Sequence, residues 1–133
     1  MGRETCRAIL ATPEFELVLA VDRPDGQTAL DELLGIDAGG LMIEEKLGAG
    51  LERVGADVLV DFTSASAAVA HAEMAFKVRA APIIGATGID KDALRTLGAL
   101  SKEHATPGMY VPNFAIGAVL MMKFSEMAAR WLP

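Results

Sequence analysis

The sequence predicts a parallel α/β fold, in which strands and helices alternate along the chain. Short apolar runs recur between helical patterns, and residues typical of tight turns follow them. Two such places are residues 83–88 (IIGATG) and 111–117 (VPNFAIG). Apolar strands that stop abruptly at turn residues are typical of the ligand-binding edge of a parallel sheet. The repeated order of strand, turn and helix predicts right-handed crossovers between these strands.

The bulk properties indicate one folded domain of ordinary size. Of the 133 residues, 52% are hydrophobic and 5% aromatic, so we expect an aliphatic core and no extensive disorder. The net charge of −6 argues against a nucleic-acid surface, because phosphate binding needs clustered Lys and Arg. The longest apolar run, residues 115–122, is too short to cross a bilayer. No signal region is recognisable and Cys6 has no second cysteine to pair with, so we expect a cytoplasmic protein without a metal site.

The first half of the chain has the weaker secondary-structure pattern. The pattern is least clear between residues 24 and 40, where turn-forming residues are frequent. The expected elements are a helix over 4–11, a strand over 14–21, a turn at 24–26, a surface loop over 37–40, a short strand over 41–43 and a short helix over 45–54.

The second half has sharper signals. Ser64 or Ser66 is a suitable N-cap for one helix and Asp90 for the next, because their side-chain oxygens can accept from free backbone N–H groups. The expected elements are a buried strand over 57–62, a helix over 64–77, a strand over 82–85, a helix over 90–104, a strand over 109–111 and an amphipathic helix over 117–131.

A spacing near the start of the chain gives the best clue to function from the residues alone. Gly2 precedes the first helix, and Asp22 ends the next strand 20 residues later. In a dinucleotide-binding βαβ unit, the last glycine of the phosphate loop lets helix and strand pack closely, and an acid about 20 residues on accepts hydrogen bonds from the adenosine ribose. Arg23 beside the acid could receive a 2′-phosphate, which keeps NADP open as well as NAD. The alternatives are a terminal glycine, a strand-end aspartate in a turn and a solvated arginine.

Three further motifs follow in a fixed order: Asp61-Phe62-Thr63, then residues 85–88 (GATG), then residues 112–117 (PNFAIG). They resemble the DFT, GTTG and NFSIGV segments of 4-hydroxy-tetrahydrodipicolinate reductase (dihydrodipicolinate reductase), an enzyme family of lysine and diaminopimelate biosynthesis. Residues 1–3 (MGR) resemble the end of the family's glycine-rich loop. The resemblance is closest between residues 57 and 123. Three ordered motifs at fitting separations are far more specific than any one of them.

The resemblance implies a Rossmann-type α/β fold, which is a parallel sheet with flanking helices. Because the chain begins inside the glycine-rich loop, we expect the first strand of that fold to be missing. Residues 1–112 would form the dinucleotide-binding domain. Residues 113–133 would form the hinge and the first helix leading into a substrate domain that is absent.

The resemblance also implies sites for ten residues, with NADH or NADPH as cofactor. On the cofactor, Gly2 and Arg3 would lie by the pyrophosphate, Asp22 and Arg23 by the adenosine ribose, and Phe62 and Thr63 along the nicotinamide half. Gly85 and Thr87 would lie where cofactor and substrate meet, and Asn113 and Phe114 would lie at the hinge. The Thr87 hydroxyl would offer a hydrogen bond to a substrate carboxylate. Without the resemblance, the two phenylalanines are better explained as core residues and Gly85 and Gly88 as turn residues.

The sequence also departs from the family pattern. Ala86 replaces a threonine of GTTG and Ala115 the serine of NFS, so each position loses a hydroxyl. The family's His-His and Lys segment and its Ser-Gly-Thr substrate loop would lie beyond Pro133, so no catalytic residue is expected in this chain. His71 and His104 cannot replace that histidine pair and are expected to be ordinary helix residues.

The resemblance implies that the complete enzyme reduces 4-hydroxy-tetrahydrodipicolinate to tetrahydrodipicolinate with NADH or NADPH, and that it is a tetramer. The isolated chain is expected to be inactive. Its partner would be a small dicarboxylate substrate, with no role for nucleic acid or membrane. One alternative is a non-catalytic, truncated nucleotide-binding domain. A weaker one is another oxidoreductase with the same first domain, such as a dehydrogenase acting on an amino-acid semialdehyde.

Overall fold

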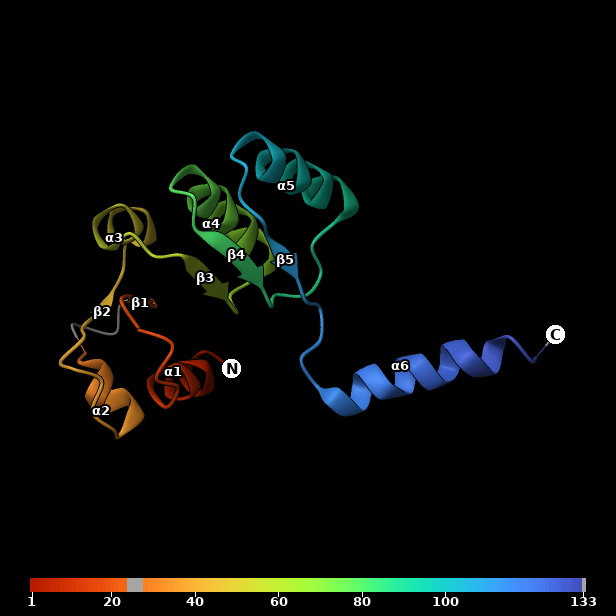
Figure 1. Cartoon of the computed structure of the whole chain (residues 1–133), viewed down its shortest axis with the longest axis horizontal. Coiled ribbons are helices and arrows are strands. Elements are labelled where there is room, and N and C mark those ends of the chain that lie inside the picture. The colour runs from red at the N-terminus through yellow and green to blue at the C-terminus, as the bar shows by residue number, and fades with distance from the viewer. Residues whose placement is uncertain (24–27, 133) are drawn as a thin grey trace.

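The computed structural model describes residues 1–23 and 28–132. Helices and short strands alternate along these residues (Figure 1). In chain order they are α1 (Gly2–Leu10), β1 (Ala20–Val21), α2 (Leu30–Leu34), β2 (Ile43–Glu44), α3 (Leu47–Val54), β3 (Val58–Asp61), α4 (Ala65–Lys77), β4 (Ala81–Ile84), α5 (Lys91–Glu103), β5 (Met109–Tyr110) and α6 (Ile116–Ala129).

The strands form two parallel sheets. β1 pairs with β2, while β3, β4 and β5 form a second sheet in that order. Within the described part of the chain, no ladder joins β1 to β3 and no strand lies between them. The predicted α/β class with parallel strands and flanking helices is confirmed.

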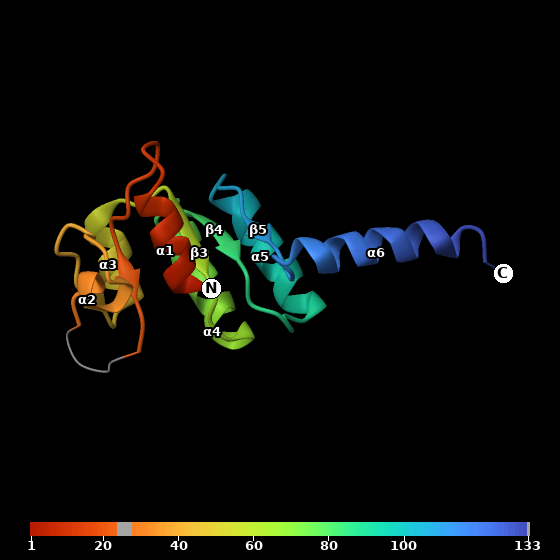
Figure 2. The same ribbon diagram turned by 90° about the horizontal axis from the view of Figure 1, so that it is seen from below.

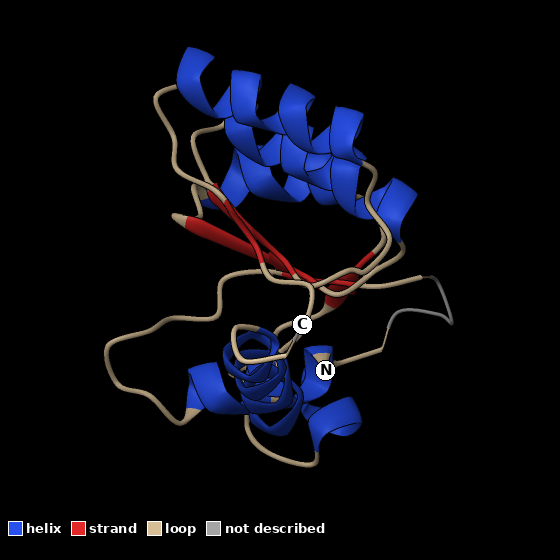
Figure 3. Ribbon diagram, turned by 90° about the vertical axis from the view of Figure 1, so that its right-hand side faces the viewer, coloured by secondary structure: helices blue, strands red, loops and turns tan. Residues whose placement is uncertain are grey.

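Helices cover both sides of the strands. α3, α4 and α5 lie on one side, while α1 and α2 lie on the other (Figures 1 and 3). Helix α4 approaches the sheet closely because its inward positions carry alanine, of which Ala68 and Ala72 are fully buried. Phe76 of the same helix packs with Ile84 of β4 and Leu97 of α5. This core packs α4 and α5 against the carboxyl end of β4.

The second half of the chain agrees closely with the prediction. Every predicted element is present, and its bounds differ by at most two residues. The strand expected to be buried is not: in β3, Val58 is 48% exposed and only Asp61 is buried. Ser64 is the N-cap of α4 and accepts a hydrogen bond of 3.4 Å from the Ala67 N–H. The Asp90 carboxylate caps α5 by accepting from the N–H groups of Asp92 and Ala93 at 2.9 and 2.8 Å.

The first half differs more from the prediction. The strand expected over residues 14–21 forms only at Ala20 and Val21, because the residues before them pair with no strand among residues 1–23 and 28–132. Helix α2 was not expected, although Leu30 and Leu34 lie one turn apart and are both buried. Gly35 ends this helix at φ 68°, a left-handed conformation that glycine adopts without strain. The turn expected at residues 24–26 lies outside the described residues.

Helix α6 projects away from the rest of the chain (Figures 1 and 2). The predicted helix is confirmed, but its description as amphipathic is wrong. Apolar residues such as Leu120, Met121 and Met122 are adjacent in sequence, so they point about 100° apart and occupy more than one face. None of its residues is buried. Within residues 1–23 and 28–132, no helix is both long and apolar enough to cross a membrane.

Candidate functional site

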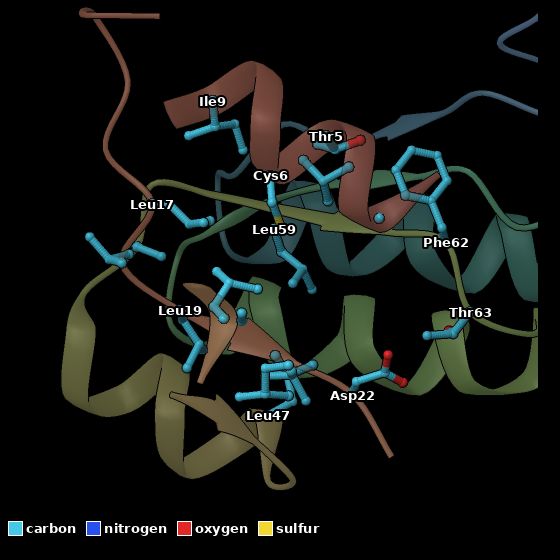
Figure 4. A pocket seen from close by; sticks show the side chains of 18 of the residues that line it. Thr5, Cys6, Ile9, Leu17, Leu19, Asp22, Leu47, Leu59, Phe62 and Thr63 are labelled. Atoms are coloured by element: carbon cyan, nitrogen blue, oxygen red, sulfur yellow. The ribbon is translucent and has the colours of Figure 1, made fainter. Parts of the chain in front are cut away.

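A cavity of about 660 Å³ lies between β1 and β3, beneath helix α1 (Figure 4). Its inner part is apolar, with walls that include Leu17, Leu19 and Leu59. The other end of the cavity lies at the carboxyl ends of β1 and β3, where Asp22 and Thr63 line it (Figure 4). Six of the ten predicted site residues line this cavity: Gly2, Arg3, Asp22, Arg23, Phe62 and Thr63.

The first turn of α1 contributes Gly2 and Arg3. Met1 is the N-cap residue and gives no side-chain hydrogen bond to the helix. The first N–H groups of a helix lack partners within it and favour an anion nearby. A Cβ atom at Gly2 would meet no described atom within 4 Å, so packing within this structure does not require glycine there.

Asp22 and Arg23 follow β1 directly and are both exposed. The Asp22 N–H donates to the Glu44 carbonyl oxygen at 3.1 Å, which extends the pairing of β1 with β2 by one residue. Its carboxylate Oδ1 accepts from the Arg23 N–H at 2.7 Å. The sheet therefore fixes the backbone of this acid at the rim of the cavity.

The end of β3 is held by a hydrogen-bond network that the sequence did not reveal. Asp61 is 5% exposed, and its Oδ1 accepts from the Thr63 N–H at 2.7 Å and from the Thr63 hydroxyl at 2.6 Å. Its Oδ2 lies 2.6 Å from Nδ1 of His71 on α4. The prediction that His71 is an ordinary helix residue is wrong, because the side chain reaches across to a buried carboxylate. The only signal in the sequence was that His71 lies in the helix directly after the strand that ends at Asp61.

Phe62, Gly85 and Phe114 meet beside this network. The two rings pack edge to face, with centroids 5.2 Å apart. A Cβ atom at Gly85 would lie 2.4 Å from Cε1 of Phe62 and 2.9 Å from Cε2 of Phe114. The absence of a side chain at Gly85 is therefore what lets the Phe62 ring lie over the end of β4.

The remaining predicted residues lie outside the cavity. Thr87 follows β4, is exposed and precedes Gly88, whose φ is 85°. Asn113 accepts a hydrogen bond of 2.8 Å from the Ala115 N–H through its side-chain oxygen, just before α6 begins. Ala86 is 4% exposed and belongs to the main core, so the methyl group at this position packs where a hydroxyl would need a buried partner.

Titratable groups give little further indication of chemistry. Burial raises the pKa of the Cys6 thiol above its ordinary value, so the thiol stays neutral at physiological pH. Among residues 1–23 and 28–132, no three His, Cys, Asp or Glu side chains are grouped as metal ligands.

The chain matches a family model described as dihydrodipicolinate reductase, N-terminus, over residues 1–114. Among curated proteins it is 39% identical over 133 residues to a 4-hydroxy-tetrahydrodipicolinate reductase from Moorella thermoacetica. It is 40% identical over 133 residues to one from Syntrophomonas wolfei. Each alignment covers 100% of this chain and 50% of the relative. The chain thus spans about half the length of the curated relatives that it matches.

A solved structure gives the same result for the fold. The chain is similar to dihydrodipicolinate reductase from Paenisporosarcina sp. TG-14, determined with dipicolinate bound, with a TM-score of 0.78. The sequences are 29% identical, and the match covers 96% of this chain and 49% of that one. The similarity therefore includes nearly every described element.

Proposed function

Because the chain belongs to the dihydrodipicolinate reductase family, whose N-terminal part it matches, we propose that it binds a reduced nicotinamide dinucleotide where β1 and β3 end. The observation that carries this proposal is the convergence of six predicted residues from three elements on one cavity. In open parallel sheets, ligands bind outside the carboxyl ends of the strands. Asp22 would accept from ribose hydroxyls, and the first turn of α1 would face the pyrophosphate.

The residues at the end of β3 and β4 fit the nicotinamide half. The Phe62 ring occupies the space that a Cβ atom at Gly85 would fill, so the lack of a side chain at Gly85 lets this ring lie at the end of β4. A flat ring beside a residue without a side chain offers a surface on which a planar group can lie. We infer that Phe62 and Thr63 orient this half of the dinucleotide. Thr87, at the exposed turn after β4, would meet a carboxylate of the substrate.

The proposed reaction of the complete protein is the reduction of 4-hydroxy-tetrahydrodipicolinate to tetrahydrodipicolinate in lysine and diaminopimelate biosynthesis. The bound nicotinamide supplies the hydride. The residues of this chain orient the dinucleotide, and the half of the relatives that the chain does not span would supply the proton donor and most carboxylate contacts. Residues 113–133 would then form the hinge and first helix of the substrate domain. A cytoplasmic location remains a prediction from the sequence, and a tetrameric assembly remains a prediction from the family resemblance.

The cofactor preference depends on two adjacent side chains. The Asp22 carboxylate favours the ribose diol of NADH, whereas the Arg23 guanidinium is suited to the 2′-phosphate of NADPH. Both residues are exposed at the rim of the cavity. We propose that the protein accepts both cofactors.

A spectrophotometric assay tests the reaction. A protein of the relatives' full length that contains these 133 residues, called the full-length protein below, is mixed with NADH or NADPH and with freshly generated 4-hydroxy-tetrahydrodipicolinate. We expect oxidation of the nucleotide that depends on the substrate. Saturable nucleotide binding without any turnover would instead support the second candidate, a non-catalytic nucleotide-binding domain.

A further inference from the structure

His71 lies at the middle of α4 and contacts the buried end of β3. Its Nδ1 is 2.6 Å from Oδ2 of Asp61, whose side chain is 4% exposed. The other carboxylate oxygen already accepts two hydrogen bonds from Thr63. Because Asp61 acts as an acceptor in all of these contacts, Nδ1 of His71 is the donor. The two oxygens of one buried carboxylate are thus linked to two different elements, α4 and the turn after β3.

This network fixes the direction of the Thr63 hydroxyl. A hydroxyl group has one proton, and that of Thr63 is donated to Asp61 over 2.6 Å. Toward the cavity, which Thr63 lines, the oxygen therefore presents only lone pairs. A ligand group that faces it must be a hydrogen-bond donor, such as a carboxamide or a ribose hydroxyl. A phosphate oxygen, which only accepts, does not fit.

We propose that His71 is a positioning residue, which acts through Asp61 to hold the Thr63 hydroxyl as an acceptor for a donor on the nicotinamide half of the dinucleotide. This inference rests on the proposed function and deepens it. Loss of the His71 donor leaves a buried carboxylate with one oxygen unpaired, so the turn after β3 can rearrange to satisfy it. The hydroxyl would then be free to point elsewhere.

Two histidine replacements separate this role from simple packing. In His71→Asn the side-chain amide nitrogen takes the position of Nδ1 and keeps the donor to Asp61. In His71→Gln the amide nitrogen reaches instead the position of Nε2, and in His71→Ala no donor remains. His104→Ala is the control, because His104 lies at the C-terminal end of α5 and does not line the cavity.

The full-length protein is used for two measurements on these variants. The first is hydrogen exchange of the Thr63 backbone amide without nucleotide, which reports the hydrogen bond to Asp61 directly. The second is calorimetric titration with NADH and, separately, with ADP, which lacks the nicotinamide half. A packing defect weakens both nucleotides, whereas a misdirected Thr63 hydroxyl weakens only NADH.

We expect His71→Ala and His71→Gln to bind NADH about five- to tenfold more weakly, the equivalent of one hydrogen bond, with ADP affinity unchanged. Thr63 amide protection should fall in the same two variants and persist in His71→Asn and His104→Ala. Equal NADH affinity in all variants, a parallel loss of ADP affinity, or His71→Asn no better than His71→Ala would overturn the inference. If the variants show the expected differences in NADH affinity but the full-length protein has no reductase turnover, only the reaction proposed above is overturned.

Discussion

The rings of Phe62 and Phe114 pack edge to face, with centroids 5.2 Å apart and ring planes inclined at 65°. Phe62 follows β3, and Phe114 precedes α6, so this contact joins the cavity wall to the segment that leads out of the sheet. Edge-to-face pairs of this kind contribute about 0.5 to 1.5 kcal/mol beyond the area that they bury. The pair therefore restrains the ring of Phe62 at the site.

Replacement of Gly85 tests this arrangement. A Cβ atom would approach the Phe62 ring to 2.4 Å, so Gly85→Ala must push that ring away from its contact with Phe114. We expect NADH affinity of the full-length protein to fall about tenfold, since both aromatic packing and the nicotinamide surface change. Gly98→Ala is the control, because a Cβ there meets no described atom within 4 Å. That control should stabilise α5 by about 0.5 to 1 kcal/mol. Unchanged NADH affinity in Gly85→Ala would show that the ring position is unimportant.

The cap of α5 gives a prediction about stability. The Asp90 carboxylate accepts two N–H groups of the first turn at 2.9 and 2.8 Å, whereas Ser64 accepts one at 3.4 Å. We expect Asp90→Ala to lower the free energy of unfolding by about 1 kcal/mol and Ser64→Ala to lower it by less. Urea unfolding followed by circular dichroism measures both. If Ser64→Ala lowers the free energy of unfolding more than Asp90→Ala does, the number and length of the cap hydrogen bonds do not determine the order.

The second half of the fold was predictable because its signals are local. Asp90 caps a helix that begins at the next residue, and β3 consists of three apolar residues followed by Asp61. The strand expected over residues 14–21 failed for a non-local reason, since extended residues become a strand only where another strand pairs with them. Helix α2 was obscured by the turn-forming residues around it.

The candidate site was predicted unevenly for the same reason. Motif positions such as Asp22 and Thr63 line the same cavity, and their roles toward the two halves of a dinucleotide stay predictions. The contact of His71 with Asp61 joins a helix to a strand end, and no periodicity or propensity of an alanine-rich helix indicates what its histidine touches. Thr87 and Asn113 lie outside the cavity. Their predicted roles, at the substrate and at the hinge, involve a substrate domain that residues 1–133 do not contain.

The 133-residue chain by itself should not catalyse the reaction. The family resemblance assigns the proton donor and the main carboxylate contacts to the half of the relatives that this chain does not span. We expect no substrate-dependent oxidation of NADH by the isolated chain, while the full-length protein turns over. An isolated chain with a rate near that of the full-length protein would show that the catalytic groups lie within these residues.

The isolated chain should also self-associate. Helix α6 exposes large apolar side chains, with Phe124 63% and Trp131, just beyond it, 88% exposed. In the part of the chain that the structure describes, β1 and β3 also have no ladder partner on the cavity side. Such edges and apolar faces favour association in water. Light scattering should detect oligomers, and an apolar dye should bind. A monomer with a sharp thermal transition at high temperature and no dye binding would contradict this expectation.

The central claim, that the ends of β1 and β3 bind a nicotinamide dinucleotide, is tested most directly by calorimetric titration of Asp22→Ala. The full-length protein and this variant are titrated with NADH and with NADPH, and Asp92→Ala on α5 serves as the control. We expect NADH binding to weaken by about 1 to 3 kcal/mol in Asp22→Ala, because charge-assisted hydrogen bonds to the ribose are lost. NADPH should lose less or gain, since a carboxylate near its phosphate is removed. Unchanged affinity for both nucleotides, or no binding by the unmodified protein, would contradict the account.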